Sequence, residues 1–143
     1  MYRLLTEDGS AGRMPVADEA DKRVVAEKFL AGFCEGDWSL IKSVMAEDIV
    51  WSLPGRNLIS GEVRGIEAVV QRAQLISSYG LHFRLTYLLI GQHGIALSLK
   101  NTARHGRLFL NECFSLVCQF RGGKISAIDT FLSNVAVANA FFV

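Results

Sequence analysis

The chain has 143 residues, the length of one ordinary domain, and its 15 Lys and Arg residues nearly balance 14 Asp and Glu residues. A charged fraction of 20% and only two prolines exclude an overall disordered chain, and a net charge of +1 gives no electrostatic footprint for nucleic acid or an anionic membrane. Half of the residues are apolar, more than a small core needs, which predicts a lined ligand cavity or a dimer face.

The sequence shows no sign of a membrane or secreted protein. No apolar run approaches the ~20 residues of a spanning helix, and the first residues lack the apolar region of a signal peptide. The cysteines Cys34, Cys113 and Cys118 are odd in number and have no metal-ligand spacing. We therefore expect reduced thiols in a cytoplasmic protein.

The N-terminal part is predicted to be an arm followed by helices. Turn-forming residues predict a flexible arm over residues 1–16, and residues 17–143 are predicted to form a single domain. A helix is predicted over Asp18–Gly36, because its first residue is a suitable N-cap and apolar residues recur at helical spacing. A short second helix is expected from about Trp38 to Met45.

The next segments alternate between strand and helix. Ile49–Leu53 is predicted to be a short strand that ends at the turn dipeptide Pro54-Gly55. A loop then leads to a third helix, Ile66–Ser78, whose apolar residues fit a period of 3.6.

From Leu81 onward the period of the apolar residues changes to two, which is typical of strands with one apolar face. Further strands are predicted over Ile95–Thr102, Arg107–Phe120 and Ile125–Leu132, separated by glycine-containing turns. The apolar tail, Val135–Val143, fits either strand or helix. This order predicts an α+β fold with the helices gathered on one face of a meander sheet.

Three segments carry a resemblance to a known family. Residues 29–38 read Phe-Leu-Ala-Gly-Phe and then Glu-Gly-Asp-Trp, residues 50–69 contain Trp-Ser-Leu-Pro-Gly and a later Arg-Gly-Ile-Glu-Ala, and residues 120–125 read Phe-Arg-Gly-Gly-Lys-Ile. In this order, over about residues 20–134, the chain resembles the SnoaL-like and ketosteroid-isomerase-like branch of the nuclear-transport-factor-two-like superfamily. The resemblance implies a cone, in which a curved, mostly antiparallel sheet packs against three N-terminal helices around one deep apolar pocket, and usually a dimer.

The resemblance also allows the isomerase positions to be carried over. The phenol falls on Phe29, the base on Leu53 and the acid on Leu116, and all three are apolar here. A hydrocarbon side chain neither accepts a proton nor stabilises an oxyanion. Steroid isomerisation by that mechanism is therefore not expected.

Glu112 is the first candidate catalytic residue. It shares strand parity with Phe114, Leu116 and Cys118, the face that we expect to point into the cone. Desolvation there would raise the pKa of its carboxyl group and make it a usable acid or base. The alternative is an exposed strand end, with Glu112 in solvent or paired with Arg107.

Asp129 is the second candidate catalytic residue. The resemblance to SnoaL-like cyclases places their base position on Ser133, four residues later, and a four-residue shift keeps the same face of a strand. The alternative is an Asp that caps or pairs at the sheet surface.

Other side chains are predicted to contact a ligand. Arg56 and Asn57 follow the Pro-Gly turn at the expected pocket mouth, where they either orient a carbonyl or carboxylate group or lie in an exposed turn. The full predicted set is Phe29, Phe33, Trp51, Leu53, Arg56, Asn57, Phe114, Leu116 and Cys118. The three histidines show no ligand spacing, so we expect neither a metal nor a cofactor.

We therefore predict an apolar pocket that binds a small hydrophobic molecule, cyclic or polyketide- or steroid-like. Whether the chain is an enzyme stays open; if so, we expect isomerase, cyclase or hydrolase chemistry by acid–base catalysis. The alternatives are a non-catalytic binding module and a dimeric interaction protein that uses the sheet face and the apolar residues 139–143. The predicted partners are the small molecule and a second copy of the chain, with no nucleic acid and no membrane.

Overall fold

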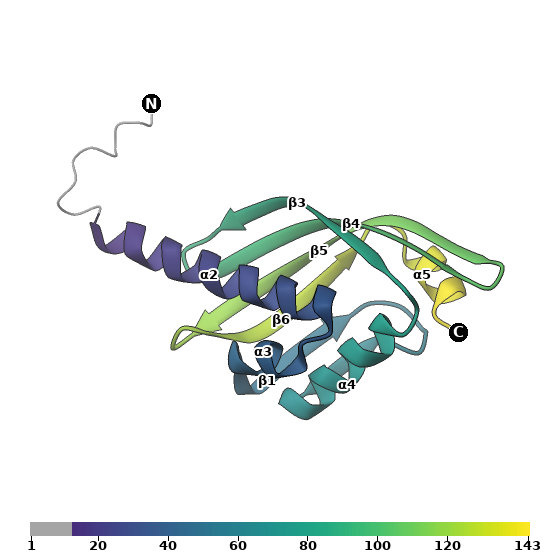
Figure 1. The fold of residues 1–143 in the computed structure, drawn as a ribbon, viewed down its shortest axis with the longest axis horizontal. Helices are drawn as coiled ribbons and strands as arrows, with labels where there is room; N and C mark the ends of the chain where they lie inside the picture. The colour runs from purple at the N-terminus through teal and green to yellow at the C-terminus, as the bar shows by residue number, and fades with distance from the viewer. Residues whose placement is uncertain (1–12) are drawn as a thin grey trace.

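The computed structural model describes residues 13–143 and confirms the α+β prediction. In Figure 1, α2 crosses one face of the six-stranded sheet, α3 packs against α2, and α4 lies beside α3 and β1. No helix among the described residues is both long and apolar enough to cross a membrane.

The first described helix, α2 (Arg13–Glu35), begins five residues earlier than predicted. The last four residues of the predicted arm therefore belong to α2, and residues 1–12 lie outside the described part. The prediction ended the arm near Pro15, because proline often interrupts a helix. Pro15 instead lies in the first turn of α2, where the backbone N–H group that proline lacks is not needed for a helical hydrogen bond. The helix ends before Gly36, whose φ of +69° favours glycine.

The remaining helices are α3 (Trp38–Ser43), α4 (Ile66–Ser77) and α5 (Val135–Phe141). The apolar tail is thus a helix, capped by the Asn134 side chain, which accepts a hydrogen bond from the Val137 amide. Phe141 and Phe142 are buried and pack on the ring of Tyr79. This part of the tail belongs to the core rather than to an adhesive outer surface.

The strands are β1 (Met45–Leu53), β2 (Gly61–Arg64), β3 (His82–Ile90), β4 (Gly94–His105), β5 (Leu108–Arg121) and β6 (Lys124–Leu132). They lie in the order β2-β1-β6-β5-β4-β3, and every pair is antiparallel except β1 with β6. The prediction placed β2 in a loop, because four mostly polar residues carry no alternating pattern.

Alternation along the two longest strands separates the inner and outer faces of the sheet. Every second residue of β4, from Ile95 to Ala103, is buried, and the residues paired with these on β5 also face the helices. The core forms where this inner face meets α2, α4 and α5. The site therefore has to be sought among the inward residues of β4, β5 and β6.

Candidate functional site

A cavity of about 60 Å³ lies between the inner face of the sheet and the helices. Space of this size accommodates a few water molecules or a small ligand group. Cys34 of α2 lines the cavity and is itself exposed, so the cavity reaches the surface beside the end of that helix. The wall is formed by Leu30, Phe33, Cys34, Trp51, Leu53, Ile59, Ile76, Leu81, Phe83, Leu99, Asn101, Glu112, Phe114, Leu116, Thr130, Leu132, Ala138 and Phe142.

Two polar side chains face each other across the β4–β5 pair inside this apolar wall. Asn101 and Glu112 are register partners, and they are only 4% and 6% exposed. Oδ1 of Asn101 and Oε2 of Glu112 are buried without a hydrogen-bond partner. Such atoms are uncommon in folded proteins, because an unmade hydrogen bond leaves the full cost of desolvation.

Desolvation raises the pKa of the Glu112 carboxyl group, and a hydrogen bond from the Asn134 backbone amide opposes this rise. Glu112 lies on β5, two residues before Phe114, which pairs with Leu132 at the end of β6. Glu112 is therefore beside the turn that leads from β6 to α5, and the backbone of this turn reaches its carboxyl group. The carboxyl group therefore holds a proton more readily than an exposed glutamate, as a group that takes part in acid–base chemistry often does.

A second polar cluster lies at another part of the cavity wall, on β1 and β6. Nε1 of Trp51 donates to Oγ1 of Thr130 at 2.8 Å, and both residues are buried and line the cavity. The guanidinium group of Arg72 lies 5.1 Å from the centre of the Trp51 ring. It donates to the carbonyl oxygens of Trp51, Ser60 and Gly61 at 3.2, 3.1 and 2.9 Å.

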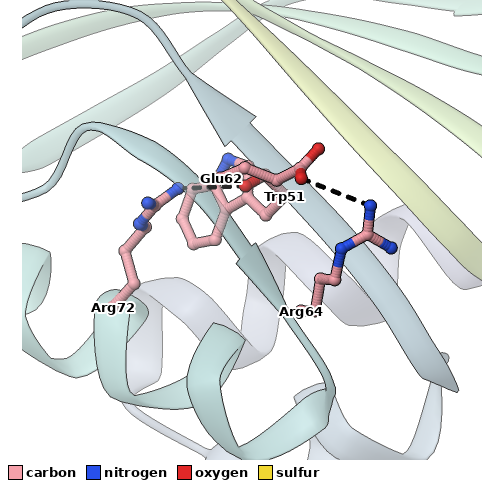
Figure 2. Close-up of polar contacts among 4 residues, drawn as sticks. All are labelled: Trp51, Glu62, Arg64 and Arg72. Atoms are coloured by element: carbon pink, nitrogen blue, oxygen red, sulfur yellow. Dashed lines mark hydrogen bonds and ion pairs between the residues drawn. The ribbon is translucent and has the colours of Figure 1, made fainter.

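Figure 2 shows Arg72 reaching from α4 to the Trp51 carbonyl, and the exposed Arg64–Glu62 ion pair on β2. Burial lowers the pKa of Arg72, although a guanidinium group remains charged in proteins. Its three carbonyl acceptors come from β1, from β2 and from the loop between them. Arg72 therefore fixes the indole that forms one wall of the cavity.

Asp129 is exposed and does not line the cavity, which corrects its expected placement. Its strand neighbours Ile128 and Thr130 are buried, so alternation along β6 turns Asp129 to the outer face. The prediction took Ser133 as an inward reference, yet Ser133 is exposed and its Oγ accepts a hydrogen bond from the Cys113 amide.

Arg56 and Asn57 do not line the cavity either. The Arg56 backbone amide and Nδ2 of Asn57 both donate to Oδ1 of Asn139, at 2.7 and 2.8 Å. Oδ1 of Asn57 accepts from the Ile59 amide at 3.0 Å. These residues tie the loop after β1 to α5, and the Arg56 side chain is exposed.

Of the other predicted contacts, Phe33, Trp51, Leu53, Phe114 and Leu116 line the cavity. The two remaining side chains, Phe29 and Cys118, are buried in the core outside the wall. Burial raises the pKa of the Cys118 thiol to about 12, so it stays a protonated packing group.

The sequence reasoning missed Asn101, Arg72, Thr130 and Cys34. Asn101 follows Leu97 and Leu99 at alternating positions of one strand, so parity alone would have placed it inside. Over the described residues, no group of three His, Cys, Asp or Glu side chains is arranged to hold a metal ion.

Comparison with known proteins supports the fold. Neither a protein-family model nor a curated protein matches the chain. Among solved structures, Bal32a from a soil-derived mobile gene cassette is 21% identical, with a TM-score of 0.81 over 87% of this chain and 98% of that one.

An NTF2-like protein from Burkholderia xenovorans LB400 is 20% identical, with a TM-score of 0.75 over 86% of this chain and 97% of that one. A putative ketosteroid isomerase from Kribbella flavida is also 20% identical, with a TM-score of 0.68 over 82% and 81%. The chain therefore has the cone-shaped NTF2-like fold, and identities at this level concern the fold alone.

Proposed function

We propose that the chain binds a small, mostly apolar molecule in the cavity and that Glu112 exchanges a proton with it. The observation that carries this proposal is the buried carboxyl oxygen of Glu112, which has no partner inside an otherwise apolar wall. A group that costs stability and points into a cavity is a candidate functional group. The proposal also assigns the chain to the SnoaL-like or ketosteroid-isomerase-like branch suggested by its sequence.

A single carboxyl group suits a proton shift better than hydrolysis or cyclisation. Glu112 would take a proton from one atom of the substrate and return it to another, so no co-reactant is needed. One similar structure is named a putative ketosteroid isomerase, which fits this reaction class. Because Phe29, Leu53 and Leu116 are apolar, the proton would move at a different place in the cone.

The cavity also limits the size of the molecule. At about 60 Å³ the cavity cannot enclose a steroid, and a one-ring molecule would fit into it only in part and extend through the opening beside Cys34. The aromatic rings of Phe33, Phe83 and Phe114 form consecutive tilted or edge-to-face pairs with centroids 5.2 and 5.8 Å apart. Such a wall favours a flat apolar body.

A screen of one-ring molecules tests this proposal. Each is added to the Cys113→Ser variant, in which alkylation of the exposed Cys34 reports occupancy of the cavity. Molecules that protect Cys34 are then assayed for conversion by the wild type and by Glu112→Gln, and we expect conversion to be lost in the variant. No protection by any molecule, or equal conversion by both proteins, would contradict the proposal.

A non-catalytic binder is the second candidate, favoured by the fact that Glu112 is the one carboxylate among the described wall residues. In that case Cys34 is protected, but no ligand is converted.

Self-association is a separate proposal, supported by the outer face of the sheet. Large apolar side chains on this face are exposed, among them Tyr87, Leu89, Val117 and Phe131. We propose that a second copy of the chain covers them, because contiguous exposed apolar residues mark interfaces. Sedimentation of Phe131→Lys beside the wild type tests this, and a monomeric wild type would refute it.

A further inference from the structure

We infer that the ligand held in this cavity carries a primary amine, and that its ammonium group binds between Glu112 and Asn101. This inference rests on the proposed function, and it adds the chemical class of the molecule.

Hydrogen-bond counting gives the first argument. An ionised carboxylate only accepts hydrogen bonds, and the amide oxygen of Asn101 only accepts as well. Directly opposed residues of an antiparallel pair have Cβ atoms about 5 Å apart, so both oxygens border the same small space. No side chain among the described residues donates to either of these atoms. With Glu112 ionised, a single ligand group that satisfies both atoms has to supply two donors, which a primary ammonium does and a hydroxyl does not.

Charge gives the second argument. A buried carboxylate is costly unless an opposite charge or several donors compensate it. Arg72 does not do so, because its guanidinium group is bound to three carbonyl oxygens at the Trp51 wall. A ligand cation would neutralise Glu112 and form a charge-assisted hydrogen bond with it.

The aromatic residues give the third argument. Phe83 pairs with Asn101 on the other side of β4, so Phe83, Asn101 and Glu112 form one row across three strands. Phe83 also contacts the rings of Phe33 and Phe114. Aromatic rings beside a carboxylate stabilise a cation through their negative faces, and they hold the apolar body of the same molecule.

Three probes of matched shape test the inference. Benzylamine, benzyl alcohol and ethylbenzene differ only in the terminal group, which is an ammonium, a hydroxyl or a methyl. Calorimetry near neutral pH should show benzylamine binding about 10- to 100-fold more tightly than ethylbenzene, and more tightly than benzyl alcohol. Protection of Cys34 in the Cys113→Ser variant places each probe in the cavity.

Variants give the control. Glu112→Leu and Glu112→Gln should remove most of the preference for benzylamine, Asn101→Leu should reduce it, and Asp129→Asn, on the outer face, should leave it unchanged. If ethylbenzene or benzyl alcohol binds the wild type as tightly as benzylamine, the inference is wrong while the proposed binding function stands. If no probe binds and none protects Cys34, the amine inference is wrong, and the proposed binding function is decided separately by the screen of one-ring molecules.

Discussion

Replacing Glu112 with leucine should stabilise the protein. Leucine has a similar volume, and the surrounding wall residues are mostly apolar. The substitution removes a buried oxygen without a partner and leaves only the Asn134 amide to find water. Replacing a buried charged group by a hydrophobic residue of similar size is often stabilising for this reason.

The expected gain follows from the cost of an unsatisfied buried group, about 1–3 kcal/mol. For 143 residues, an unfolding entropy of about 2.1 cal/mol/K per residue sums to about 0.3 kcal/mol/K. The free energy of unfolding should therefore rise by about 1–3 kcal/mol, and Tm by about 3–10 °C. The exposed Glu47 on β1 provides the matched control, since Glu47→Leu should change stability by no more than about 0.5 kcal/mol.

The gain should also depend on pH. The pKa of Glu112 is higher in the folded than in the unfolded chain, because burial disfavours its ionised form. The folded state then binds more protons between these two pKa values, so wild-type stability falls as pH rises through that window. Below the unfolded pKa of about 4.3 the burial cost of the charge is absent, and above the folded pKa it is complete.

Urea unfolding of the wild type, Glu112→Leu and Glu112→Gln across this range gives the measurement. The advantage of Glu112→Leu should be small at acidic pH, grow through the window and stay constant above it. A variant that is less stable than the wild type at alkaline pH, or an advantage independent of pH, would refute this account of the carboxyl group.

Arg72→Met should lower the free energy of unfolding by about 2–4 kcal/mol, because three carbonyl oxygens lose their donor. As the control, Arg64→Met removes only the exposed Arg64–Glu62 ion pair and should cost less than about 1 kcal/mol. Equal losses in urea unfolding would show that Arg72 does not hold the wall. Trp51→Phe should lower the free energy of unfolding by about 0.5–1.5 kcal/mol, because the hydrogen bond to Thr130 is lost. It should also weaken ligand binding measured by calorimetry, and an unchanged affinity would show that the indole is not part of the site. Asp129→Asn should leave ligand conversion unchanged, and a loss of turnover would restore Asp129 as a catalytic candidate.

The inward position of Glu112 could be predicted because strand parity needs no tertiary information. A long strand with a clear alternation fixes its face, and Glu112 shares that face with Phe114 and Leu116. Asn101 obeys the same rule on β4, but its amide neither gives nor takes a proton near neutral pH, so its residue type alone does not indicate a role. The chemistry of the site comes from the pairing of these two residues, which depends on the β4–β5 register.

The errors concern residues whose position depends on more than local pattern. Asp129 was assigned from a reference position after β6, where the chain has already left the strand. Arg72 follows Val69 by three positions and precedes Ile76 by four, so it lies on the buried face of α4. A charged residue on such a face predicts a buried partner, but only the fold shows that the partners are carbonyl oxygens and an indole ring.

The unpartnered oxygens of Asn101 and Glu112 stand out because the polar groups near them are satisfied. The Trp51 indole, the Thr130 hydroxyl and the Arg72 guanidinium, also buried, all make hydrogen bonds. Within the described residues, Asn101 and Glu112 alone leave buried side-chain atoms without partners, and they face each other across one cavity. Packing alone would favour leucine at position 112, so a stability cost confined to this place indicates a function. If Glu112→Leu is more stable than the wild type and no longer binds the amine, the stability that the carboxyl group costs is linked to ligand binding. If the variant is more stable and still binds and converts the ligand as the wild type does, Glu112 has no part in the site.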